Sequence, residues 1–480
     1  MAGFTAKHAL TLVGLAFFLA NLSSMLQISF DSDIRDFNAN VNEWFLNLSV
    51  PAATVTVDQV EEKSHVKSTN TNDNINIKIN NVIGYAITFT KCQPDDNDEK
   101  NGLDQAAVLL YSIHQNSARN PSSGSKYDYK AYAFLHRDHA ANCTDILERI
   151  GYHVQIRDSP VEIPQIKGTL RHYVHEASCC QEKEFMKLYS YTLVDHAVVV
   201  HLDLDCMVLK PLDDLFNAMQ LGKSAAVKSK LQLQWDTNYT NFPDKSNKKK
   251  NNGDVVEAFF TRDYNMVKPK VRKPHQVGVQ GGFLVIKPDI DVFEQYIATI
   301  IDGNYTRDHG WGGRKLRYGG YYGAAQIQGL CAYFFGAIRP GTSVELNGCY
   351  YNFMGDDPRD EREDNQCKNG QQECQDCRTV AFQDIKTVHF TECTKPWWCL
   401  ANARHGNREK KLGGPLAFPL CLQAHRAWYR NRQQLEQVWS EQDPTYNVTS
   451  IDWMDNETLA YCEEGYIYRK MTFPTTKVSL

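Results

Sequence analysis

The chain has 480 residues, of which 42% are hydrophobic and 11% aromatic, and its formal net charge is −5. This composition can fill a sizeable core, so it excludes a mostly disordered chain and a small disulfide scaffold. The acidic balance also argues against a strongly basic surface, and no nucleic-acid partner is expected.

The first 30 residues predict entry into the secretory pathway. Residues 9–26 are apolar, with Lys7 before them and acidic residues after them. Extended to Phe30, the segment reaches the ~20 residues that span a bilayer, and its flanking charges favour a single-pass type II membrane anchor. Leu10–Ala20 alone fits the apolar region of a cleaved signal peptide. A buried core helix is the third interpretation.

Two further features agree with a lumenal location. The 14 cysteines are many for a cytosolic enzyme but ordinary for a lumenal one. Asparagine sequons follow the apolar segment, at Asn47, Asn142, Asn238, Asn304, Asn447 and Asn456. We therefore expect the protein in the Golgi or ER membrane with its catalytic domain in the lumen, or secreted if the segment is cleaved.

The rest of the chain divides into a stem and one catalytic domain. Residues 31–80 are polar and lack apolar periodicity, which predicts a disordered stem. The catalytic domain is expected over residues 81–480, with a cysteine-rich part at about 340–480. There, Cys367, Cys374 and Cys377 could form a zinc knuckle, but no second C-x-x-C or His pair accompanies them. Disulfides are therefore favoured, and their pairing stays open.

Strand and helix patterns alternate from Val82 onward. Short apolar runs predict strands at 84–90, 131–135, 154–156, 198–202 and 283–286. Apolar stripes at helical spacing predict helices at 106–113, 144–150, 185–193, 291–300 and 324–335. We expect Asn142 to cap the second of these helices and Asp291, with Glu294, to cap the fourth. The alternation implies right-handed βαβ units, and hence an α/β fold with a mostly parallel central sheet.

Two acidic residues follow the buried strand at 198–202. Asp203 and Asp205 are two positions apart, so in an extended chain both carboxylates point the same way and can reach one cation. Ligands of open parallel sheets bind outside the carboxyl ends of the strands. Two hard oxygen donors there suit Mg²⁺ or Mn²⁺ that also binds phosphates. The alternative for an isolated D-x-D is a solvated turn.

Several motifs, in order along residues 82–400, resemble those of the family 8 glycosyltransferases, the glycogenin-like retaining enzymes of the GT-A nucleotide-diphospho-sugar transferase fold. They are G-Y-A-I-T-F-T with L-L-Y-S-I, K-L-Y-S-Y before D-L-D and D-D-L-F, Q-G-G-F-L-V-I-K-P, I-Q-G-L-C-A-Y-F-F and V-H-F-T-E-C-T-K-P-W. Each motif is weak alone, whereas the ordered set is specific. The resemblance implies a Rossmann-like GT-A domain and a UDP-sugar donor.

The resemblance also implies roles for individual residues. The ligands of Mn²⁺, with Mg²⁺ as the alternative, would be Asp203, Asp205 and His389. The residues that contact the nucleotide-sugar would be Thr88, Thr90, Lys187, Gly282 and Lys395. Such a set is chemically sensible, because a divalent cation and a lysine stabilise the negative charge that grows on a departing diphosphate. Without the family pattern, His389 would be interpreted as a core histidine.

Two segments depart from the family pattern. Ile327 replaces the Asp of the acceptor-side D-Q-G, and Gln280 begins a Q-G-G where the family has N-S-G. Both segments lie near the transferred sugar in the family, so the sugar and the acceptor stay open. The candidates for contacts with sugar hydroxyls are Gln280, Gln326 and Gln328.

For the remaining segments we mainly expect structural roles. Trp397 and Trp398 are expected to pack in the core. The lysine-rich stretch 244–253 and the acidic run 356–364 are expected to be solvated. The Gly/aromatic loop at 309–322 is either an aromatic platform for an acceptor sugar or a turn-rich loop.

We therefore expect a retaining hexosyltransferase that moves a sugar from a UDP-sugar to a glycan, protein or lipid acceptor in the secretory pathway. No carboxylate is obviously placed as a nucleophile, so front-face attack is the favoured mechanism. One alternative is a non-catalytic lumenal binding protein on the same fold, suggested by Ile327. The other is a metal-dependent phosphohydrolase of nucleotide sugars.

Overall fold

The computed structural model describes residues 81–92, 102–175, 180–221, 255–266, 276–319, 321, 323–360, 364–399, 414–449, 461–462 and 468–480. The expected anchor or signal segment at 1–30, the stem at 31–80 and the lysine-rich stretch at 244–253 lie outside these residues. Among the described helices, none is both long and apolar enough to cross a membrane.

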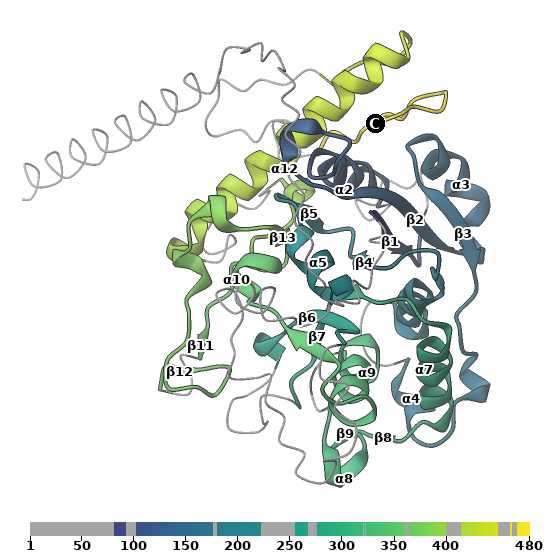
Figure 1. Ribbon diagram of the computed structural model, residues 1–480, viewed down its shortest axis with the longest axis vertical. Coiled ribbons are helices and arrows are strands. Elements are labelled where there is room, and N and C mark those ends of the chain that lie inside the picture. Colours follow the sequence, from purple (N-terminus) through teal and green to yellow (C-terminus); the bar gives the residue numbers. More distant parts are fainter. Residues whose placement is uncertain are drawn as a thin grey trace, which may run out of the picture. The chain divides into compact units, whose positions relative to one another are not determined.

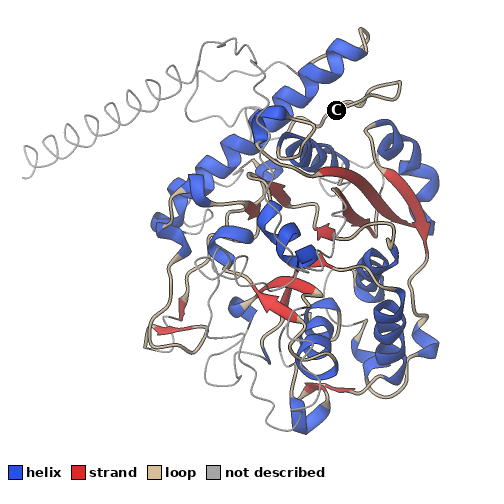
Figure 2. Ribbon diagram, viewed as in Figure 1, coloured by secondary structure: helices blue, strands red, loops and turns tan. Residues whose placement is uncertain are grey.

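The centre of the fold is a seven-stranded sheet (Figure 2). In spatial order its strands are β10 (Ser343–Glu345), β6 (Ala258–Arg262), β7 (Val279–Ile286), β4 (Val199–Leu202), β1 (Val82–Phe89), β2 (Asp128–His136) and β3 (His153–Arg157). Only β7 runs antiparallel to its neighbours, β4 and β6; the other pairs in this sheet are parallel. The predicted mostly parallel sheet is confirmed.

Helices cover both faces of this sheet, and short strands form three small ribbons (Figure 1). The described α-helices are α2 (Leu103–Gln115), α3 (Ala140–Arg149), α4 (Leu170–Tyr173), α5 (Asp213–Leu221), α7 (Ile290–Asp302), α8 (Gly313–Leu316), α9 (Ile327–Tyr333), α10 (Gly348–Tyr351) and α12 (Gly414–Gln442). The ribbons pair β5 (Cys206–Val208) with β13 (Thr387–His389), β8 (Tyr305–Thr306) with β9 (Gly310–Trp311), and β11 (Arg359–Asp360) with β12 (Gln366–Cys367).

The alternation of side chains along the strands divides the interior into two cores. In β4, Val200 and Leu202 face the core that α2, α5 and α12 cover, whereas Val199 faces the core that α7 and α9 cover. Because both faces are covered, all four residues of β4 are buried, as its continuous apolar run predicted. Figure 1 shows α2 beside α12 and α7 beside α9.

The helix caps differ from those expected. α3 begins at Ala140, so Asn142 lies inside the helix, where its amide nitrogen donates to the carbonyl oxygen of Cys92 at 3.4 Å. α7 is capped by Asp289, whose carboxylate accepts hydrogen bonds from the backbone of Asp291 and Val292. The segment expected as a helix at 185–193 forms a 3₁₀-helix, Gln181–Thr192.

Five disulfides stabilise the described residues, and four of them join parts of the C-terminal half. They are Cys92–Cys143, Cys349–Cys377, Cys367–Cys374, Cys393–Cys421 and Cys399–Cys462. The three cysteines that could have formed a zinc knuckle are therefore all disulfide-bonded, as expected. Two of the bonds tie the segment 393–399 to α12 and to residue 462, so this segment is held from both ends.

The predicted burial of Trp397 and Trp398 and the predicted exposure of the acidic run are confirmed only in part. Trp397 is buried, but 43% of Trp398 is exposed, so the expectation of core packing is wrong for Trp398. In the Gly/aromatic loop, Trp311 and Tyr318 are buried, and the Trp311 indole donates to Ala324 at 2.8 Å; these rings pack in the core. The acidic run is not simply solvated either, because Asp360 is buried.

Candidate functional site

The site lies where the neighbouring strands β1, β4 and β7 reach the same end of the sheet. β1 and β4 are parallel, so Thr88 and Asp203 come to the same edge, and β7 starts there because it is antiparallel to β4. The backbone N–H of Asp203 donates to the carbonyl oxygen of Gly282 at 3.0 Å. The sheet itself therefore places the first aspartate against the glycine segment of β7.

A short antiparallel ribbon brings in the histidine. Since β5 pairs with β13, His389 stands opposite Cys206, directly beside Asp205. The His389 Nε2 lies 3.2 Å from the Asp205 Oδ1, and the histidine is buried. The Phe390 N–H also donates to the carbonyl oxygen of Asp205 at 2.8 Å. The structure thus brings together Asp205 and His389, which are far apart in sequence.

Each aspartate is paired with a lysine. The Lys187 Nζ lies 2.7 Å from the Asp203 Oδ1, 2.7 Å from the Glu184 Oε1 and 3.2 Å from the carbonyl oxygen of Gly281. The Lys395 Nζ forms an ion pair with the Asp205 Oδ2. Each carboxylate thus has its own positive partner, and a diphosphate bound there could meet both lysines.

The electrostatics keep Lys187 and Asp205 ionised. Burial works against the charge of Lys187, but Asp203 and Glu184 outweigh it and hold its pKa well above the usual value. Burial likewise opposes the charge of Asp205, yet His389 and Lys395 hold the pKa of that carboxyl well below its usual range. Carboxylates that stay ionised at neutral pH are the form that binds a cation.

Cys206 is the third residue whose ligand atom lies near those of Asp205 and His389. Burial and the charges of Asp205 and Asp203 raise the pKa of its thiol well above the usual value. The thiol donates to the carbonyl oxygen of Gly282 at 3.2 Å, so it serves packing. A metal here would be held by oxygen and imidazole nitrogen, which suits Mn²⁺.

Gly282 lets two of the expected ligands pack against the backbone of β7. A Cβ at this position would clash with the His389 Cε1 and would stand 2.9 Å from the Asp203 Oδ2. Only a residue without a side chain therefore allows His389 and Asp203 to approach so closely, and we call this position the glycine cradle. Ligand atoms of Asp205 and His389 lie within 4.8 Å of each other, and carboxylate oxygen with imidazole nitrogen suits a divalent cation.

A pocket of about 200 Å³ opens beside these groups. It is lined by Glu184, Lys187, Asp203, Gln280, Gly281, Gly282, Gly323, Gln326, Ile327, Gln328, His389 and Thr391. Among the described residues, neither the His389 Nδ1 nor the Gln328 Oε1 has a hydrogen-bond partner, although both atoms are buried. Buried polar atoms normally find partners, so both are open to a polar ligand.

The side-chain amides of Gln280, Gln326 and Gln328 form different hydrogen bonds within the protein. The Gln280 Oε1 accepts from the Gly282 N–H at 2.7 Å, so this side chain holds the glycine cradle. The Gln326 Nε2 donates to the carbonyl oxygen of Val174 at 3.0 Å. The Gln328 Oε1 is buried and has no hydrogen-bond partner among the described residues, so Gln328 can accept a hydrogen bond from a sugar hydroxyl.

The two threonines assigned to the nucleotide lie at the sheet edge but do not line this pocket. The Thr88 Oγ1 lies 3.5 Å from the His201 Nε2, and the Thr90 hydroxyl donates to the Cys180 Sγ at 3.3 Å. Lys395 also lies outside the lining, next to Trp398, whose ring centroid is 5.8 Å from the Lys395 Nζ. Their nucleotide roles stay predictions.

Two further residues of this region were not expected from the sequence. Glu184 pairs with Lys187 three positions later, a spacing that places both on one helical face. Asp263 follows β6 as Asp203 follows β4, and it is buried. Burial and the charge of Asp356 raise the pKa of its carboxyl to about 6. The apolar run before it, A-F-F-T, was the signal that could have found it.

No protein-family model matches this sequence, and no curated protein matches it. Solved structures do. Mouse xyloside xylosyltransferase 1 is similar at 11% identity and a TM-score of 0.36, covering 66% of this chain and 99% of that one. The galactosyltransferase LgtC is similar at 13% identity and 0.33, covering 69% and 95%. The glycosyltransferase GlyE of Streptococcus pneumoniae is similar at 12% and 0.35, covering 78% and 66%.

All three similar structures are glycosyltransferases, the class that the sequence motifs resemble. Membership of family 8 stays a prediction.

Proposed function

We propose that this protein is a retaining glycosyltransferase of the GT-A type that moves a hexose from a UDP-sugar to a glycan, protein or lipid acceptor, with Mn²⁺ as cofactor. One observation carries the proposal: Asp205 and His389 meet at 3.2 Å beside two paired lysines, and His389 lines a pocket together with Asp203 and several amide side chains. Mg²⁺ is the alternative cation.

The residues divide the chemistry between them. Asp203, Asp205 and His389 would hold the cation, which when bound neutralises the diphosphate and lowers the energy of its departure. Lys187 and Lys395 supply fixed positive charge at the same place, so the growing negative charge meets groups that need no rearrangement. Gln328, which lines the pocket, offers its buried oxygen to a hydroxyl of the transferred sugar.

The location in the secretory pathway is part of the proposal. Five disulfides support an oxidising compartment, because cytosolic thiols are kept reduced. The described sequon asparagines, Asn142, Asn304 and Asn447, are exposed and hence accessible to glycosylation. A Golgi or ER membrane protein with a lumenal catalytic domain fits both observations.

Release of UDP tests the reaction class. The purified protein is incubated with a panel of UDP-sugars and Mn²⁺, with and without glycan, glycoprotein and lipid acceptor extracts. Release that needs an acceptor supports sugar transfer, and acceptor-independent release would instead indicate a phosphohydrolase. Binding of UDP without any release would indicate a non-catalytic binding protein, the alternative favoured by the apolar Ile327 in the pocket wall.

A substitution at the metal site tests the assignment of residues. Asp205→Ala removes a carboxylate that His389 and Lys395 both contact, so we expect Mn²⁺-dependent UDP binding to weaken by about 100-fold or more. Isothermal calorimetry with and without Mn²⁺ measures this. The control is Asp302→Ala, an exposed carboxylate at the end of α7. Unchanged UDP binding in Asp205→Ala would refute the metal site.

A further inference from the structure

A second pocket of about 150 Å³ lies between the end of β6 and the cysteine-rich loop. Its lining includes Arg262, Tyr264, Glu345, Asn352, Met354 and Lys368. The residues proposed to bind the metal and the nucleotide do not line this pocket. The residues that line it carry amide, hydroxyl and paired charged groups.

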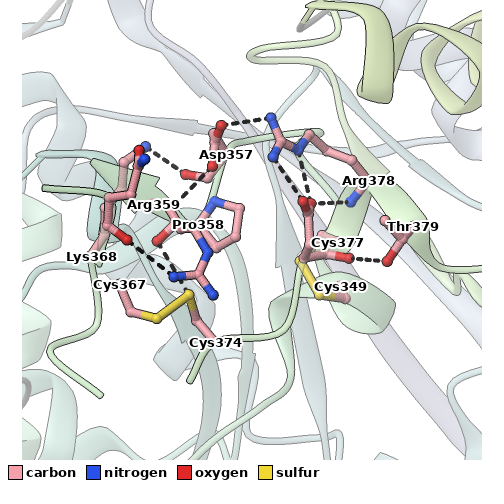
Figure 3. Close-up of polar contacts among 12 residues, drawn as sticks. Cys349, Asp357, Pro358, Arg359, Cys367, Lys368, Cys374, Cys377, Arg378 and Thr379 are labelled. Carbon is pink, nitrogen blue, oxygen red and sulfur yellow. Dashed lines mark hydrogen bonds and ion pairs between the residues drawn. A yellow bond between two sulfur atoms is a disulfide. The ribbon is translucent and has the colours of Figure 1, made fainter. Parts of the chain in front are cut away.

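The wall of this pocket is held rigidly by covalent and ionic links (Figure 3). Cys367–Cys374 closes a short loop, and Cys349–Cys377 ties that region to α10. Arg378 links the two sides, since its guanidinium lies 2.7 Å from both Asp357 and Asp376. The Lys368 Nζ donates to the carbonyl oxygen of Asp357 at 2.6 Å. A pre-organised wall reduces the entropy that a ligand must overcome on binding.

The charges in the pocket cancel one another. The Arg262 Nε lies 2.9 Å from the Glu345 Oε2, and the Tyr264 hydroxyl donates to the other Glu345 oxygen at 2.8 Å. Asn265 connects the remaining two charges: it accepts from the Lys368 Nζ at 2.6 Å and donates to Asp356 at 2.9 Å. Because cations and anions are matched, the pocket favours a neutral polar ligand over an ionic one.

One buried polar atom in the pocket has no partner. Asn352 is 1% exposed, and its amide nitrogen donates to the Thr261 hydroxyl at 2.8 Å. Its Oδ1, in contrast, meets no donor among the described residues. A buried carbonyl oxygen left open in this way is costly unless a ligand or water donates to it. A sugar hydroxyl is a donor of the required kind.

The second pocket adjoins the first. Met354 lines the second pocket, and its Sδ lies 3.8 Å from the Gln280 Nε2, which belongs to the lining of the first. The preceding residue, Phe353, accepts a hydrogen bond from the His389 N–H at 2.8 Å. A ligand in the second pocket would therefore end one side chain away from the metal and sugar site.

We propose that this second pocket binds the neutral saccharide part of the acceptor, a role that rests on the proposed glycosyl transfer. The matched charges select an uncharged glycan, Asn352 accepts from one of its hydroxyls, and the disulfide-linked wall fixes its orientation. The Met354–Gln280 contact places the bound saccharide next to the pocket proposed for the donor sugar.

Gly348 offers a way to block the pocket without disturbing its wall. Gly348 belongs to the lining, and a Cβ there meets no atom within 4 Å, so a larger side chain has room. We would compare Gly348→Trp and the smaller Gly348→Leu with Glu373→Trp, an exposed residue of the same disulfide loop that does not line the pocket. Each full-length variant is also tested for Mn²⁺-dependent UDP binding, which reports on the first site alone.

The probes are four neutral p-nitrophenyl glycosides: β-xyloside, β-galactoside, β-glucoside and α-mannoside. Saturation-transfer NMR measures their binding. We expect the unaltered protein to bind at least one of them, and Gly348→Trp to weaken that binding by about tenfold or more. Glu373→Trp should bind it normally, and all variants should keep their affinity for UDP.

Two results would overturn the inference: no glycoside binds the unaltered protein, or both Gly348 variants bind it as well as Glu373→Trp does. If glycoside binding follows the expected pattern while UDP fails to bind the unaltered protein, the saccharide pocket stands and the proposed transferase function falls. The two claims are thus tested separately.

Discussion

Two clusters of buried charge in this protein have opposite surroundings. In α12, Arg432 pairs with Glu436 at 2.7 Å, and both side chains are completely buried. At the candidate metal site, Asp203 and Asp205 keep 31% and 18% of their side chains exposed, although each is paired with a lysine. The first cluster is sealed inside the protein, whereas Asp203 and Lys187 of the second line a pocket.

The partners of the two clusters differ as well. The Arg432 Nη1 donates to the carbonyl oxygen of Arg469 at 2.6 Å, and the Glu436 Oε2 accepts from the Thr449 N–H at 2.7 Å. These bonds hold the C-terminal segments against α12. The metal-site carboxylates instead pair with Lys187 and Lys395, whose charges a bound diphosphate could also contact. Buried charge that is sealed contributes to folding, and buried charge that borders a pocket is available for function.

The largest expected effect breaks the sealed cluster. Arg432→Met leaves Glu436 buried without its cation, so the free energy of unfolding should fall by about 3–5 kcal/mol. Urea unfolding measures this, and UDP affinity under folding conditions should not change. Arg137→Met, which removes an exposed partner of Asp158, should leave stability unaltered. Equal stability of Arg432→Met and the unaltered protein would contradict the comparison.

Asp263 is a third kind of buried acidic group, because it has no paired cation among the described residues. The pH dependence of stability tests its effect. The pKa of the Asp263 carboxyl is raised to about 6, against ~3.9 in an unfolded chain. Between these values the folded state binds more protons, so this group lowers stability as the pH rises and reaches its full cost above pH 6.

Asp263→Asn removes that cost. Unfolding in EDTA should show the variant more stable than the unaltered protein by about 3 kcal/mol at neutral pH, with the difference vanishing near pH 4. Asp302→Asn, at an exposed position, is the control. A variant that is less stable at both pH values would show that Asp263 is not a costly buried acid.

The smallest expected effect concerns the close packing of His389 and Asp203 against Gly282. Gly282→Ala places a Cβ against the His389 imidazole and 2.9 Å from the Asp203 Oδ2. We expect Mn²⁺-dependent UDP binding to weaken by about tenfold, because displacing an orienting contact costs about 10–100-fold in metal affinity. Gly348→Ala, which meets open space, is the matched control. Equal UDP affinity in both variants would mean that the cradle is not used.

The two clusters were not equally predictable from sequence. Asp203 follows the largely apolar run 198–202, so the sequence placed it at the end of a strand. Asp205 lies in a turn that the Cys206 N–H closes on the Asp203 carbonyl oxygen, so the expectation of an extended D-x-D is wrong for Asp205. Arg432 and Glu436 have the (i, i+4) spacing of ordinary surface pairs, and only the packing of distant C-terminal segments buries them. Local patterns thus predict a strand end well, but they do not predict which helix face other segments cover.

Other features needed contacts that no local pattern specifies. His389 reaches Asp205 through the pairing of two three-residue strands, whose register is not readable from their length or composition. Lys187 and Lys395 were found through family resemblance, while Glu184 and Asp263 were missed. The 14 cysteines predicted disulfides, but the pairing that builds the wall of the second pocket depends on the folded chain.

The central claim, one divalent cation held by Asp203, Asp205 and His389, is tested most directly by anomalous diffraction from crystals grown with Mn²⁺ and UDP. We predict a single manganese peak at coordination distances of about 2.0–2.3 Å from the His389 Nε2 and from carboxylate oxygens of Asp203 and Asp205, next to the UDP diphosphate. A manganese peak elsewhere, or UDP bound with no manganese between its diphosphate and these side chains, would contradict the account.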